Sequence, residues 1–174
     1  MLGRSADIVS EARQYAEAKH MGQKKKYADK PYFNHVEAVV DTLRRAGIDD
    51  AITLAAAYLH DVVEKSDTKL HDIARQFGAD VAELVFWLTD PEDDDETVLL
   101  PVWRLSRAPM QAKLIKFADI IDNAARKRAH APHEAFKAWA DEKALILERM
   151  IEVDVSRLAE QPLFQRARTA ITSP

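Results

Sequence analysis

The chain has 174 residues, a length that fits one domain. Its 47% hydrophobic and 31% charged residues are typical of a globular protein and exclude an intrinsically disordered chain. The formal net charge of −4 supplies no electrostatic attraction to nucleic acid or to an anionic membrane, so DNA, RNA and membranes are not expected as partners.

Apolar side chains recur at every third or fourth position in the first half of the chain, which is the spacing of one face of an α-helix. Ile8, Ala12 and Ala16 show this spacing near the N-terminus. Glycine at 47 and at 78 marks the end of two helices. The predicted helices of this half cover residues 5–20, 34–45, 50–65, 70–77 and 80–88.

The second half begins with the acidic run "TDPEDDDET", residues 89–97, which we predict to be a loop because its charges repel and Pro91 interrupts a helix. Two long helices are predicted over 109–127 and 132–160, followed by a short one from Pro162. No segment alternates apolar and polar residues as a strand does. The sequence therefore predicts an all-α fold: one domain over 1–174, a multi-helix bundle completed by helices within 132–172.

Several functional classes are excluded by missing residues and motifs. The chain has no cysteine, so disulfides, thiolate metal ligands and cysteine nucleophiles are ruled out. It has four glycines and neither a GxGxxG nor a GxxxxGK[ST] motif, which disfavours a Rossmann or P-loop nucleotide site. No window approaches the ~20 apolar residues of a membrane span, and no export signal is visible, so we expect a cytoplasmic protein.

Four residues with metal-binding side chains stand in apolar helical segments: His35, the adjacent pair His60 and Asp61, and Asp119. A buried carboxylate needs a cation or hydrogen-bond donors nearby. One divalent ion would compensate all of these groups, and two imidazoles with two carboxylates suit Mn, Fe or Zn. A His-Asp pair is also common on helices without a metal, so from the residues alone a structural role remains an open alternative.

Four segments in order resemble one family: "GQKKKYADKPYFNH", "LAAAYLHDVVEKSDT", "IARQFGADVAELVFWLTD" and "AKLIKFADIIDN". They resemble the HD phosphohydrolase superfamily, and more narrowly the hydrolase domain of RelA/SpoT homologues and the stand-alone small alarmone hydrolases. The resemblance covers residues 6–126. It implies an HD-type helical bundle and a metal-dependent guanosine-3′,5′-bis(diphosphate) 3′-pyrophosphohydrolase, which releases pyrophosphate from (p)ppGpp-like alarmones by means of a metal-activated water.

The resemblance also implies roles for individual residues. His35, His60, Asp61 and Asp119 match the metal ligands, with Mn²⁺ as the usual ion. Glu64 matches the first carboxylate of a Glu-Asp pair that positions the attacking water. Asn123, one turn after Asp119, matches a residue that touches the ribose or a phosphate of the nucleotide substrate.

Basic residues near these motifs are candidates for substrate binding. Lys24, Lys25 and Lys26 could hold the nucleotide by charge and by stacking over the base, and Lys116 could contact a phosphate, as could Lys113. Plain solvation of these side chains is the alternative. His20, His71, His130 and His133 are expected at the surface or at helix ends, without a metal-binding role.

Lys65 departs from the family pattern, because it stands where the second carboxylate of the Glu-Asp pair is expected. Glu64 could suffice while Lys65 faces solvent, Lys65 could bind a phosphate and change the substrate, or activity could be weak or lost. The alternatives to alarmone hydrolysis are thus an HD phosphohydrolase for another nucleotide or phosphate ester, and a nucleotide-binding module with weakened catalysis. The last third of the chain is expected to complete the bundle or to contact a second subunit in a homo-oligomer.

Overall fold

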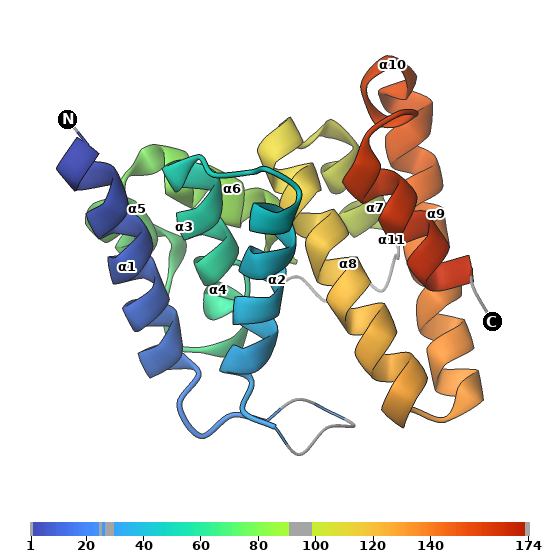
Figure 1. The fold of residues 1–174 in the computed structure, drawn as a ribbon, viewed down its shortest axis with the longest axis horizontal. Helices are drawn as coiled ribbons and strands as arrows, with labels where there is room; N and C mark the ends of the chain where they lie inside the picture. Colours follow the sequence, from blue (N-terminus) through green and yellow to red (C-terminus); the bar gives the residue numbers. More distant parts are fainter. Residues whose placement is uncertain (1, 25, 27–29, 91–98, 173–174) are drawn as a thin grey trace. The chain divides into compact units, whose positions relative to one another are not determined.

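The computed structural model describes residues 2–24, 26, 30–90 and 99–172. Within these ranges all regular elements are α-helices, apart from an isolated backbone bridge between Lys24 and Pro31, which confirms the predicted all-α class (Figure 1). The helices form two compact units, Met1–Thr89 and Asp90–Pro174, each of which is described by itself. No helix in the described ranges is both long and apolar enough to cross a membrane.

The first unit is built around a short apolar helix. Its elements are α1 (Leu2–Lys19), α2 (Phe33–Arg45), α3 (Ala51–Leu59), α4 (Val62–Lys65), α5 (Leu70–Phe77) and α6 (Ala79–Leu88). Helix α3 packs against α1, α2 and α6, and its residues from Thr53 to Leu59 are buried (Figure 1). Asp50 caps α3 by accepting hydrogen bonds from the backbone N–H groups of Ile52 and Thr53, both at 3.2 Å.

The prediction of one continuous helix over 50–65 is wrong. Helix α3 ends at Leu59, His60 and Asp61 form a turn, and α4 begins at Val62. The imidazole of His60 explains the interruption, because its Nδ1 lies 2.8 Å from the carbonyl oxygen of Ala57. In a continuous helix that oxygen would accept from the N–H of Asp61, so the side chain competes with the helical hydrogen bond.

Helices α5 and α6 meet at Gly78, as the glycine predicted. Gly78 has φ 93° and ψ 163°, a backbone conformation open essentially to glycine alone. A residue with a Cβ atom would be strained in this conformation. Glycine adopts it without strain, so α6 can start directly after α5 ends.

The second unit consists of α7 (Leu99–Arg107), α8 (Met110–His130), α9 (His133–Val153), α10 (Val155–Leu158) and α11 (Pro162–Thr172). Helix α8 packs against α9 and α11, with the rings of Phe117 and Phe164 5.4 Å apart (Figure 1). The sequence did not predict α7, although Pro101 falls in its first turn, where a helix tolerates proline. Most of the predicted acidic loop lies outside the described residues, which resume at 99.

The predicted helix over 132–160 is also interrupted. Asp154, with φ −140° and ψ 53°, separates α9 from α10. Its carboxylate lies 3.5 Å from the ammonium of Lys113, which is buried on α8. The break therefore coincides with an ion pair between two helices, a tertiary contact that periodicity along one helix does not reveal.

Candidate metal centre

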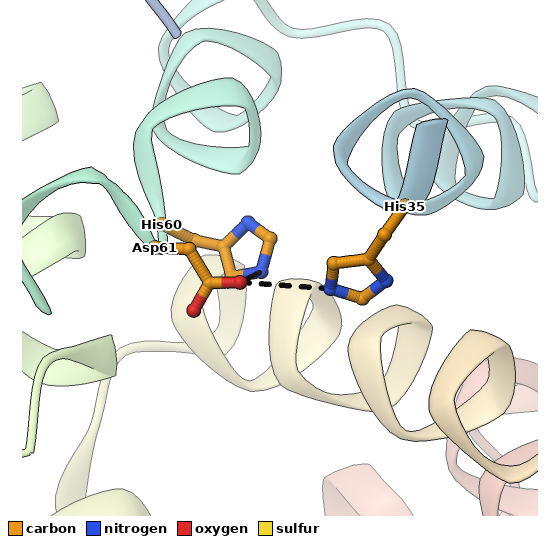
Figure 2. Close-up of side chains that lie close together, drawn as sticks. All are labelled: His35, His60 and Asp61. Carbon is orange, nitrogen blue, oxygen red and sulfur yellow. Dashed lines mark ion pairs between the residues drawn. The ribbon is translucent and has the colours of Figure 1, made fainter. Parts of the chain in front are cut away.

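Three of the predicted metal ligands meet inside the first unit. His35 comes from α2, and His60 and Asp61 come from the turn between α3 and α4 (Figure 2). The three residues are 4%, 5% and 9% exposed. The Nε2 atoms of His60 and His35 lie 3.2 Å and 3.6 Å from Oδ2 of Asp61, and the three potential ligand atoms all lie within 4.8 Å of one another.

The imidazole of His60 is oriented by the backbone. A carbonyl oxygen only accepts hydrogen bonds, so Nδ1 of His60 donates to Ala57, and Nε2 is the ring nitrogen that faces Asp61. Metal-binding histidines typically donate their second ring N–H in this way, which fixes the tautomer and the ring plane. The orientation of His60 is therefore compatible with metal binding through Nε2.

The donor set fits a divalent metal. Four tetrahedral ligands about 2.1 Å from an ion lie about 3.4 Å from each other, which matches the spacing of the two imidazoles from Asp61. Two imidazole nitrogens and a carboxylate oxygen suit a borderline ion such as Mn, Fe or Zn.

Burial alone raises the pKa of Asp61, but the imidazoles of His60 and His35 and the ammonium of Lys65 hold it well below its usual range. Asp61 is thus an ionised, buried carboxylate.

Tyr32 belongs to this centre, although the sequence assigned it no role. Its hydroxyl donates a hydrogen bond to Oδ2 of Asp61, and its ring stacks on His20 at a centroid distance of 4.8 Å. His20 follows the end of α1, as expected, but it is 2% exposed and does not lie at the surface. Tyr32 and Asp61 are 29 positions apart, so no local spacing could have indicated their contact.

Glu64 and Lys65 stand one turn after His60 and Asp61, on α4. The ammonium of Lys65 lies 3.0 Å from Oδ1 of Asp61 and 3.3 Å from Oε2 of Glu64. Burial lowers the pKa of Lys65, but the two carboxylates outweigh this effect and raise it, so the side chain is charged. Lys65 therefore does not extend freely into solvent: its side chain is 33% exposed and paired with two carboxylates. The i, i+4 spacing of Asp61 and Lys65 could have indicated their pairing.

The lysine loop begins beside α4. The side-chain amide of Gln23 donates to the carbonyl oxygen of Lys65 at 2.7 Å and to that of Lys19 at 3.2 Å. Lys24, the next residue, is exposed, as is Lys26, while Lys25 lies outside the described residues. The start of the loop is thus fixed next to the helix that carries Glu64, and the role of the three lysines in substrate binding stays a prediction.

The remaining predicted residues lie on α8 in the second unit. Asp119 is buried; its Oδ2 lies 3.1 Å from the ammonium of Lys116, and its Oδ1 accepts a hydrogen bond from Asn123. Arg126 in turn donates to the amide oxygen of Asn123. The residues Lys116, Asp119 and Asn123 therefore form one connected polar group on one helix, and their roles toward metal and substrate stay predictions.

The chain is similar to several characterised proteins. The family model described as "HD domain" matches residues 12–97. The guanosine-3′,5′-bis(diphosphate) 3′-pyrophosphohydrolase MESH1 of Drosophila melanogaster is 37% identical over 137 residues, which cover 76% of this chain and 74% of that protein. MESH1 of Homo sapiens is 38% identical over 126 residues, 70% of each chain.

A solved structure extends the similarity to most of the chain. It belongs to a metazoan SpoT orthologue described as hydrolysing ppGpp and playing a role in starvation responses. The two chains are 30% identical, with a TM-score of 0.82 over 94% of this chain and 93% of the other. The fold expected from the resemblance, an HD-type helical fold, is thereby confirmed.

Proposed function

Because this chain belongs to the HD-domain family of small RelA/SpoT-like alarmone hydrolases, we propose that it is a guanosine-3′,5′-bis(diphosphate) 3′-pyrophosphohydrolase. The observation that carries the proposal is the buried cluster of His35, His60 and Asp61, whose ligand atoms face one another within a fold shared with a ppGpp-hydrolysing protein. The substrate class comes from the similarity, and the ability to bind a divalent ion comes from the side chains themselves.

His35, His60 and Asp61 would hold the ion, and we propose Mn²⁺ as that ion and Asp119 as the fourth ligand. Two imidazoles with carboxylates are compatible with manganese, and the resemblance of "AKLIKFADIIDN" to the family supports Asp119. When bound, such an ion supplies a Lewis acid and a water of lowered pKa. The protein contributes the position of the ligands and a buried surrounding.

Glu64 is the residue we propose as the general base. It follows His60 by four residues and Asp61 by three, and its side chain is 23% exposed beside the ligands, within reach of solvent. In the reaction, a water oxygen bonds to the phosphorus attached to the ribose, Glu64 takes up the water's proton, and the bond to the 3′-oxygen breaks. The two phosphates are released as pyrophosphate, and the 3′-oxygen takes up a proton from solvent while Glu64 returns its own.

The substrate-binding residues of the proposal are all polar or basic. A ppGpp molecule carries two diphosphates, so cationic and amide side chains are the expected contacts. Those proposed here are Lys24, Lys25, Lys26, Lys116 and Asn123. A cytoplasmic location and a homo-oligomeric assembly stay predictions of the sequence.

The position of Lys65 favours a second candidate function. An ammonium 3.0 Å from Asp61 adds positive charge where the family pattern has a carboxylate, which could shift preference to another nucleotide or phosphate ester. Comparing ppGpp with ppApp, NADPH and nucleoside monophosphates would separate the two candidates. A binding module without catalysis would bind ppGpp and release no product from any of them.

The direct test is pyrophosphate release from ppGpp by the purified protein loaded with Mn²⁺. We expect turnover by the native chain, and a loss of about 10²–10⁴-fold in kcat for Glu64→Gln, which removes the base but not a proposed ligand. His60→Ala should lose both metal and activity. His71→Ala, at a histidine whose side chain is 75% exposed, is the matched control and should keep full activity.

Two outcomes of this assay would contradict the proposal. A protein that demonstrably holds Mn²⁺ and yet releases no pyrophosphate from ppGpp is not the proposed enzyme. Full activity in Glu64→Gln would instead show that the base is assigned to the wrong residue.

A further inference from the structure

A cation of the protein lies against the metal centre. The ammonium of Lys65 is 3.0 Å from Oδ1 of Asp61 and 3.3 Å from Oε2 of Glu64, so one charge joins a proposed ligand to the proposed base. It also lies 5.7 Å from the centroid of the Tyr32 ring.

The two oxygens of Asp61 have different partners. Oδ2 faces Nε2 of His35 and of His60 and accepts the hydroxyl of Tyr32. Oδ1 faces Lys65. The carboxylate is thus held from both sides, with one oxygen directed at the histidines and the other at the ammonium.

Lys65 is held in this place by its own backbone. Its N–H donates to the carbonyl oxygen of Asp61 at 3.1 Å, and its carbonyl oxygen accepts from the amide of Gln23 at 2.7 Å. Ordering a lysine side chain costs conformational entropy, and surface ion pairs commonly contribute little for that reason. A fixed backbone and a partly buried ammonium reduce that cost.

We propose that Lys65 is a positioning residue of the metal centre, which fixes Asp61 as a ligand through Oδ2 alone and holds Glu64 in place beside it. This inference rests on the proposed function for the role of Glu64. In this proposal the ammonium of Lys65 orients the carboxylate of the proposed base, Glu64.

The charge of Lys65 should act in opposite directions on metal affinity and on the rate of the chemical step. A positive charge next to a ligand carboxylate repels a divalent ion, so Lys65 weakens metal binding. The same charge orients Glu64, so Lys65 raises the rate of the chemical step. A residue needed only for folding would change metal affinity and rate in the same direction when it is replaced.

The test compares variants at position 65 by calorimetry with Mn²⁺ and by steady-state kinetics with ppGpp. Lys65→Met should bind Mn²⁺ about tenfold more tightly, the effect expected for removing a unit charge some 6 Å from a dication at a water-like dielectric. Its kcat should fall by about 10–100-fold, as for loss of an outer-shell partner, with KM changed by less than about twofold. Lys65→Arg keeps the charge, so its Mn²⁺ affinity should stay within about threefold of that of the native chain.

Two further variants serve as a second neutral substitution and as a control. Lys65→Gln repeats the neutralisation with a polar side chain, in case Lys65→Met folds poorly. Lys19→Met removes another lysine of the same unit, whose ammonium lies 2.7 Å from the exposed Asp67, and should change neither metal affinity nor kcat.

Weaker or unchanged Mn²⁺ binding in both neutral variants would overturn the inference, as would tighter binding with an unaltered kcat. If the native chain releases no pyrophosphate from ppGpp, the proposed function fails. The order of Mn²⁺ affinities among the position 65 variants would still decide whether Lys65 acts on Asp61.

Discussion

At the scale of single residues, the centre is organised around the carboxylate of Asp61, which contacts His35, His60, Tyr32 and Lys65. Two imidazoles, a phenol hydroxyl and an ammonium surround its carboxylate. Removing a partner from a buried charge costs more than the partner's own net contribution, because the charge is left uncompensated. Replacing a neighbour of Asp61 should therefore disturb the site even where that neighbour is not a proposed ligand.

Tyr32→Phe tests the contribution of one neighbour of Asp61, because it removes only the hydroxyl group. Its hydroxyl donates to the oxygen of Asp61 that faces the histidines, so its loss should lower Mn²⁺ affinity or activity by about 10–100-fold, measured by calorimetry and by pyrophosphate release. The expected direction for metal affinity is opposite to that for Lys65→Met, because the hydroxyl orients Asp61 without adding charge.

Tyr15→Phe is the matched control for this change. The hydroxyl of Tyr15 is 3.1 Å from Oγ1 of Thr68 in the same unit and touches none of the ligands. Equal losses of metal affinity in the two tyrosine variants would show a general loss of structure and contradict the assigned role of Tyr32.

The sequence revealed part of this site and not the rest. His35, His60 and Asp61 could be predicted because histidine and aspartate are conspicuous in apolar helical segments and because the surrounding motifs resemble a family. Tyr32 could not, since tyrosine is common in cores and its contact with Asp61 depends on how two distant segments pack. The pairing of Lys65 follows from i, i+4 spacing, but its meaning depends on the turn that brings Asp61 into the centre.

At the scale of elements, periodicity predicted where helices lie and failed where a side chain interrupts them. Helices α1, α2 and α5 lie close to where they were expected. The breaks at His60–Asp61 and at Asp154 were missed, because each depends on a contact of a polar side chain that the helical pattern does not encode. Helix α7 was missed too, next to the acidic run that was predicted to be a loop.

Gly78 provides a test at this scale. A Cβ atom at Gly78 would meet nothing within 4 Å, so the cost of Gly78→Ala is one of backbone strain alone. With φ at 93°, we expect the free energy of unfolding to fall by about 1–3 kcal/mol, measured from the shift of the urea midpoint at constant m.

Gln76→Ala, at an exposed position of α5, is the control and should leave the midpoint nearly unchanged. A Gly78→Ala protein as stable as the native chain would mean that the corner between α5 and α6 adopts another conformation.

At the scale of the whole molecule, metal binding and folding are linked, because the proposed ligands come together only in the folded chain. An ion that binds only the folded chain stabilises it by about 2.7 kcal/mol at a hundredfold excess over its Kd. We therefore expect Mn²⁺ to raise the melting temperature and a chelator to reverse the shift, as measured by thermal unfolding.

The same measurement tests the proposed role of Asp119. His60→Ala should abolish the Mn²⁺-dependent shift, and Asp119→Asn should reduce it. Asp122→Asn removes another carboxylate of α8, 3.9 Å from Arg126, and should leave it intact. A full shift in Asp119→Asn would remove this residue from the ligand set.

The brevity of α4 has a consequence for the proposed base. A helix of four residues cannot hold itself together in water, so its shape is imposed from its two ends. One end is the ligand turn; the other is tied by Gln23 to the carbonyl of Lys65 and by the hydroxyl of Ser66 to the carbonyl of Val62 at 2.7 Å. The position of the proposed base Glu64 therefore depends on these hydrogen bonds to neighbouring segments rather than on the helix itself.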